Sequence, residues 1–64
     1  MMNDVIIIPQ DFMQALMANN TARLAFEALP TQHKRDVIAW LQGEKQATSR
    51  EKRVAQAVER LLNA

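Results

Sequence analysis

The spacing of the apolar positions changes near residue 9. Before it stands an unbroken β-branched run, a composition that favours extended backbone, and Pro9 disfavours helix at the residue before it. Residues 1–8 are therefore predicted to form an extended lead-in. Its apolar run would pair as a strand, contact a second copy of the chain as a homodimer, or pack on its own domain. The residues of that run are Val5, Ile6, Ile7 and Ile8.

From residue 9 onward, apolar residues recur at three- and four-residue spacing, which predicts helices. A first helix is expected over residues 9–18, with Pro9 in its first turn and a core-facing stripe of Phe12, Met13, Leu16 and Met17. A second is expected over residues 20–28, capped by Asn19 or Asn20, with Ala22, Ala25, Phe26 and Leu29 on one side. Leu24 falls on the opposite side of that helix.

The third and fourth helices carry the candidate chemistry. The third is expected over residues 32–42, with Thr31 as its cap, Gly43 as its left-handed end, and a buried arc of His33, Val37, Ile38, Trp40 and Leu41. The fourth is expected to begin near Thr48 or Ser49, because Thr48 and Glu51 have the spacing of a capping box. Its wide apolar arc contains Val54, Ala55, Ala57, Val58, Leu61 and Leu62.

No strand alternation, internal repeat or linker separates these segments, so residues 9–64 are expected to form one all-α domain, a compact bundle of four short helices. Sixty-four residues without cysteine lie near the lower limit for a chain that folds alone, and self-association would help. The longest apolar run is too short to insert into a membrane, and no basic segment precedes it. A cytoplasmic location is expected.

The residues that enzymes and metal sites need are scarce. The chain has one histidine, one serine and no cysteine, which leaves few ways to build an activated nucleophile, and its acidic residues are dispersed. The single glycine excludes a glycine-rich phosphate loop. We therefore expect no catalytic residues, no metal site and no cofactor, and interpret His33 as a packed or edge histidine.

Four cations, Lys45, Arg50, Lys52 and Arg53, gather where the last helix should begin. Positive charge is unfavourable at a helix start, which indicates an anionic partner nearby. Arg50 lies at the edge of the apolar arc and needs an acceptor, either an internal carboxylate such as Asp36 or Glu27, or an external phosphate or carboxylate. Trp40 is either core or an exposed anchor beside these cations.

At these positions the chain resembles the bacteriocin-protection family, also called YdeI or OmpD-associated. The most specific match is a tryptophan, a lysine, and a hydroxyl residue followed by two arginines: Trp40, Lys45, Ser49, Arg50 and Arg53. The other matching positions are Pro9, Asp11, Leu16, Asn19, Phe26, Ala28, Leu29, Pro30, Arg35, Asp36, Leu41 and Val54. The chain departs from the family pattern at Val37, Glu44, Thr48 and Ser49, where the family usually has an aromatic, a small, an acidic and a threonine residue. The resemblance implies a cytoplasmic α-helical module of bacterial stress or bacteriocin tolerance, without an established reaction.

Two functions remain open. The first is a non-enzymatic interaction module whose basic corner, formed by Lys45, Ser49, Arg50 and Arg53 beside Trp40, holds an acidic group of a partner protein or of a second copy. The second is a nucleic-acid-binding bundle in which these cations meet phosphate. The net charge of +1 is slight for a nucleic-acid binder.

Overall fold

Four helices make up most of the chain in the computed structural model, which describes residues 6–63. They are α1 (Gln10–Ala18), α2 (Asn20–Glu27), α3 (Thr31–Gln42) and α4 (Ala47–Leu62). No strand occurs within residues 6–63. The predicted all-α bundle of four short helices is confirmed. Each helix begins within two residues of its expected start, and the first three end within one residue of their expected ends.

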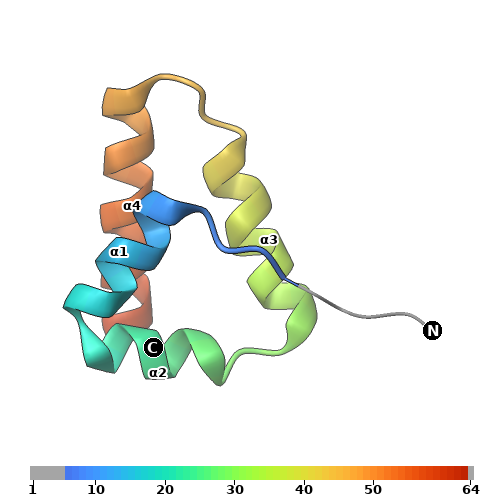
Figure 1. Cartoon of the computed structure of the whole chain (residues 1–64). Coiled ribbons are helices and arrows are strands. Elements are labelled where there is room, and N and C mark those ends of the chain that lie inside the picture. The colour runs from blue at the N-terminus through green and yellow to red at the C-terminus, as the bar shows by residue number, and fades with distance from the viewer. Residues whose placement is uncertain (1–5, 64) are drawn as a thin grey trace.

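The longest helix, α4, is the element against which the other three pack. In Figure 1, α3 and α4 run in opposite directions and are joined by the loop that precedes α4, while α2 crosses the far end of this pair. The helices are too short for a long coiled-coil seam, and a crossed arrangement lets each of them reach α4. The four short helices therefore form a crossed bundle and not an up-and-down one (Figure 1).

The core lies where α1, α2 and α4 meet, and it extends along one side of α3. The rings of Phe12 and Phe26 pack edge to face, with centroids 5.3 Å apart and planes at 89°. Aromatic pairs prefer this geometry because the positive edge of one ring meets the negative face of the other. The buried set is Phe12, Leu16, Ala22, Phe26, Ile38, Leu41, Val54, Ala57 and Leu61.

The predicted core-facing stripe of α1 includes two residues that the structure leaves exposed. Phe12 and Leu16 are buried, but Met13 and Met17 are exposed, Met17 to 71%. A helix of nine residues that packs against α2 and α4 buries only the narrow row at i and i+4, and the flanking positions face solvent. His33, also expected in the core, is exposed in the first turn of α3. Leu24 lies on the outer side of α2, as predicted.

Side-chain capping was predicted correctly at one helix only. The Asn19 side chain accepts a hydrogen bond from the Ala22 N–H at 3.2 Å, as expected for the cap of α2. Helix α3 already includes Thr31, and α4 begins at Ala47, so neither Thr31 nor Thr48 occupies a cap position. Gly43 ends α3 with φ −68° and ψ −16°, which is right-handed helical backbone, so the left-handed assignment was wrong.

Part of the predicted lead-in packs on the bundle. Residues 6–9 have no regular secondary structure, and the backbone passes across α3 in Figure 1. Ile6 and Ile8 are partly buried against the core, whereas Ile7 is 78% exposed. These residues form no strand, and Val5 lies outside the described residues. Within residues 6–63, no helix is both long and apolar enough to cross a membrane.

Candidate functional site

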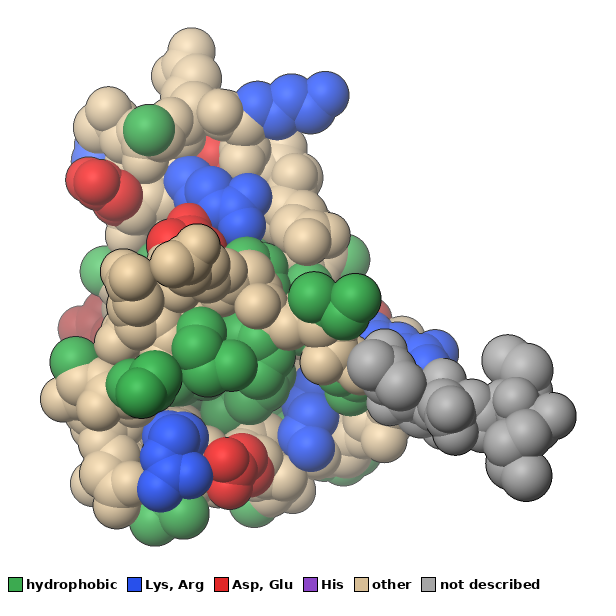
Figure 2. All heavy atoms as spheres, in the orientation of Figure 1, with side chains coloured by type: hydrophobic (Ala, Val, Ile, Leu, Met, Phe, Trp, Pro, Cys, Tyr) green, Lys and Arg blue, Asp and Glu red, His purple; other side chains and the backbone are tan. Residues whose placement is uncertain are grey.

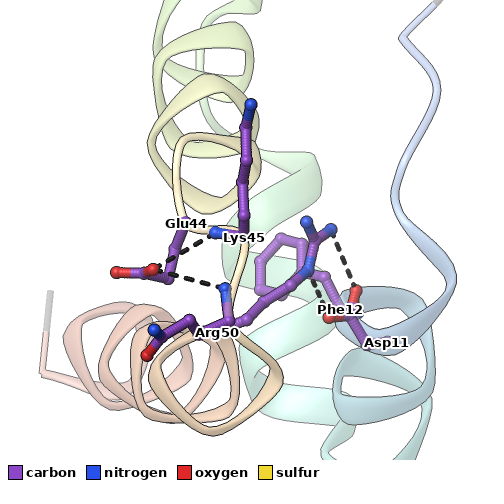
Figure 3. A network of polar contacts seen from close by, with 6 residues as sticks. Asp11, Phe12, Glu44, Lys45 and Arg50 are labelled. Carbon is purple, nitrogen blue, oxygen red and sulfur yellow. Dashed lines mark hydrogen bonds and ion pairs between the residues drawn. The ribbon is translucent and has the colours of Figure 1, made fainter.

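The predicted site residues lie around the junction of α3 and α4. Trp40 stands in the last turn of α3, Lys45 in the connecting loop, and Ser49, Arg50 and Arg53 in the first two turns of α4. We call Lys45, Ser49, Arg50 and Arg53 the basic corner. Lys45 is exposed and the other three are half-buried. Figure 3 shows that the Lys45 side chain extends away from Arg50, so the fold does not bring these two cations together.

Arg50 is held by a carboxylate from the other end of the chain. Its Nε donates to Asp11 Oδ2 at 2.6 Å and its Nη2 donates to Asp11 Oδ1 at 3.4 Å (Figure 3). The acceptors expected from the sequence, Asp36 and Glu27, are therefore wrong. Arg50 connects α4 to α1 and does not brace the junction between α3 and α4. Asp11 also accepts a hydrogen bond from the Phe12 N–H at 2.9 Å.

The Arg50 guanidinium lowers the pKa of Asp11 from its ordinary value; burial opposes this shift in part, and the Phe12 N–H adds a further lowering. The same hydrogen bond raises the pKa of Arg50. Both side chains keep contact with water, since 26% of Arg50 and 43% of Asp11 is exposed. Exposed ion pairs add little stability, so the pair orients the guanidinium more than it stabilises the fold.

Glu44 organises the loop beneath the corner. Its Oε1 accepts hydrogen bonds from the backbone N–H groups of Lys45 at 3.1 Å and Gln46 at 3.4 Å (Figure 3). Its Oε2 lies 3.8 Å from Arg53 Nη2, which is an ion pair without a hydrogen bond. Glu44 therefore orders the chain just before α4, although the start of α4 has no side-chain cap.

Trp40, on α3, contacts Arg53 of the basic corner and Arg60 further along α4. Arg53 donates from Nη1 to the Trp40 carbonyl oxygen, and its guanidinium carbon lies 5.1 Å from the indole centroid. Arg60, two turns further along α4, lies 5.7 Å from the same centroid. These are cation–π distances. The indole is half-buried and packs against the core, so it is intermediate between the two interpretations of the sequence.

Three participants were not among the site residues predicted from the sequence: Asp11, Glu44 and Arg60. Asp11 was hidden because its partner is 39 residues away. Arg60 carried a readable signal, since it follows Arg53 by seven residues and so lies on the same side of α4. Within residues 6–63, no group of three or more His, Cys, Asp or Glu residues could hold a metal ion. The site thus offers guanidinium and ammonium donors and an aromatic face.

A comparison with known families places most of the chain in one of them. The model of the family described as bacteriocin-protection, YdeI or OmpD-associated matches residues 5–63, which is nearly the whole chain. No curated protein and no solved structure matches the chain. Because the match includes all four helices and every residue of the basic corner, the chain belongs to the bacteriocin-protection, YdeI or OmpD-associated family.

Proposed function

We propose that this chain is a non-enzymatic interaction module of the cytoplasm, in which the basic corner binds an acidic group of a partner protein or of a second copy. Family membership supports a role in bacterial protection against bacteriocins and assigns no reaction. The chemical inventory supports the absence of catalysis. His33 and Ser49 stand in the first turns of α3 and α4, at opposite ends of that antiparallel pair (Figure 1).

The observation that carries the proposal is the orientation of Arg50. A guanidinium has five N–H donors in a rigid plane, and Asp11 uses one on Nε and one on Nη2. The remaining donors are free to meet a second carboxylate, because about a quarter of the side chain is exposed. Asp11 has already fixed the side chain, so an incoming carboxylate orders fewer rotatable bonds when it binds.

Arg53 is prepared in a similar way. The Trp40 carbonyl oxygen and the indole hold its guanidinium, and the 3.8 Å separation from Glu44 leaves that Nη2 without a close hydrogen bond to the carboxylate. Three carboxylates, Asp11, Glu44 and Glu51, accompany the four cations of this region, so its formal excess is a single positive charge. A local acidic group suits this balance better than a polyanion does.

The test is capture of partners from a bacterial lysate by the full chain and by its Arg50→Ala and Arg53→Ala variants, with mass spectrometry of the eluted proteins. Arg23→Ala is the matched control, because Arg23 is a partly exposed arginine in an ion pair on α2. We expect one acidic protein to be retained by the native chain and the control and lost by both corner variants. Circular dichroism must show that all four proteins keep their helices.

The same eluate profile in all four proteins would refute the docking role. The nucleic-acid alternative is tested with duplex and single-stranded DNA at low salt. Binding that weakens steeply as salt is added, and that the corner variants lose, would replace an acidic protein by a polyanion as the partner.

A further inference from the structure

We propose a second binding surface, a groove between α3 and α4 that receives a partner segment carrying an apolar side chain next to a carboxylate. The inference rests on the proposed interaction function but uses residues outside the basic corner. The groove, which we call the indole groove, is lined by Leu29, His33, Val37, Trp40, Ala57, Arg60 and Leu61. These residues come from α3, from the last two turns of α4 and from the segment between α2 and α3, whose arrangement is seen in Figure 1.

The floor of the indole groove is apolar. Ala57 and Leu61 are buried at its base, and Leu29, Val37 and Trp40 form its partly exposed walls. Its volume is about 270 Å³, below the range of pockets that enclose drug-sized ligands. A space of this size and lining suits one or two apolar side chains of a protein segment.

The polar groups at the groove are Arg60 and His33. In the part of the chain that the structure describes, Arg60 forms no ion pair and no side-chain hydrogen bond with a carboxylate, and its guanidinium lies over the indole of Trp40. A guanidinium that lies over an aromatic ring still presents its N–H groups at its edge. The N–H donors of Arg60 are therefore available beside an apolar floor. This arrangement is complementary to a segment in which an acidic side chain follows an apolar one.

A neighbouring hollow of about 200 Å³ fixes the direction of the segment. It shares Val37, Trp40 and Arg60 with the indole groove, but its fourth lining residue is Asp36, whose carboxylate accepts a hydrogen bond from Gln32 at 3.0 Å. A carboxylate of the partner would be repelled by Asp36. The acidic residue of the segment therefore binds Arg60 from the side of His33, and the apolar residue lies between His33 and Trp40.

The test uses a short helical peptide, free of tryptophan, in which leucine and glutamate residues alternate on one face. Two control peptides replace glutamate by glutamine or leucine by serine. Binding is measured by calorimetry with the full chain, and Trp40 fluorescence gives a second signal, since Trp40 is the single tryptophan. We expect the first peptide to bind and both controls to bind at least about tenfold more weakly, because each lacks one of the two required contacts.

Two variants of the protein locate the site. Arg60→Gln removes the cation and should weaken the peptide about tenfold, the effect of one charge-assisted hydrogen bond. Val37→Phe should block the groove by filling it, and it should fold because Val37 is half-buried. Arg23→Ala is the matched control and should bind as the native chain does, because Arg23 pairs with Glu27 on α2 and does not line the groove. This result would support the indole groove even if the capture experiment on the basic corner failed.

Three outcomes would overturn the inference. The first is equal binding of the acidic and glutamine peptides, which would make the groove a neutral apolar slot. The second is loss of binding in Arg50→Ala together with normal binding in Arg60→Gln, which would transfer the peptide to the basic corner. The third is a concentration-dependent dimer in sedimentation that Val37→Phe abolishes, because the occupant would then be a second copy.

Discussion

Replacement of Leu41 by alanine tests how α3, which carries Trp40, is attached to the bundle. Leu41 is 0% exposed and lies one residue after Trp40. Truncation of a fully buried leucine to alanine costs about 2–5 kcal/mol, the sum of lost burial and the cavity left behind. A domain of 64 residues has a free energy of unfolding of about 3–10 kcal/mol. The change should therefore remove a large part of the stability.

The assay is urea unfolding followed by circular dichroism and Trp40 fluorescence. With a slope near 1 kcal/mol per molar urea for a small protein, the midpoint should fall by about 2 M or more. Leu24→Ala is the matched control, because Leu24 is 52% exposed on α2 and the same truncation there should change the free energy of unfolding by about 0.5 kcal/mol or less. Ile38→Val is a milder core variant that should cost about 0.5–1.5 kcal/mol.

Equal losses in Leu41→Ala and Leu24→Ala would refute the reasoning, because burial would then not determine the cost. If Leu41→Ala is too unstable to yield a folded baseline, Ile38→Val decides the question. An unchanged midpoint in Ile38→Val would mean that this side of α3 contributes nothing to the core, although Ile38 is buried in the structure.

Three further predictions concern single contacts. Arg50 lowers the pKa of Asp11 below 3.8, so the stability that this pair contributes is present above about pH 4 and is lost as pH falls through the folded-state pKa. Asp11→Asn should therefore lose less stability on acidification than the native chain does, as measured by urea midpoints between neutral pH and about pH 2. Asn19→Ala should cost about 1 kcal/mol in unfolding experiments, since it removes the cap of α2. Gly43→Ala should leave stability unchanged or raise it by about 0.4–1 kcal/mol in the same experiments, since φ is −68° and the added Cβ would meet its nearest atoms at 3.5 Å.

Each of these predictions has a result that contradicts it. Parallel pH profiles for the native chain and Asp11→Asn would mean that the Arg50 contact does not persist in solution. Thr21→Ala is the control for the cap, and an equal cost there would mean that loss of the cap does not explain the effect. A loss above 1 kcal/mol in Gly43→Ala would indicate that the end of α3 needs a conformation open only to glycine.

The sequence indicated which cations gather at the candidate site, but it did not indicate which carboxylate pairs with Arg50. The sequence brought Trp40, Lys45, Arg50 and Arg53 to one junction, because they are close along the chain and flank a helix start. It gave no way to choose Asp11 over Asp36 or Glu27 as the partner of Arg50, since the path of α1 relative to α4 depends on how the whole core packs. Figure 2 shows one face of the molecule, on which Lys and Arg side chains lie among Asp and Glu side chains and do not form one continuous positive patch.

Local rules therefore determined the number, type and approximate bounds of the helices, because apolar spacing and the few breakers act within a turn or two of the chain. Tertiary structure decided which apolar residues are buried: Met13 and Met17 have the same periodicity as Phe12 and Leu16 but lack a facing helix. It also decided how α3 and α4 lie relative to one another, and residues of both helices line the indole groove beside Arg60. A groove is a relation between two helices, and its shape depends on contacts far apart in the sequence.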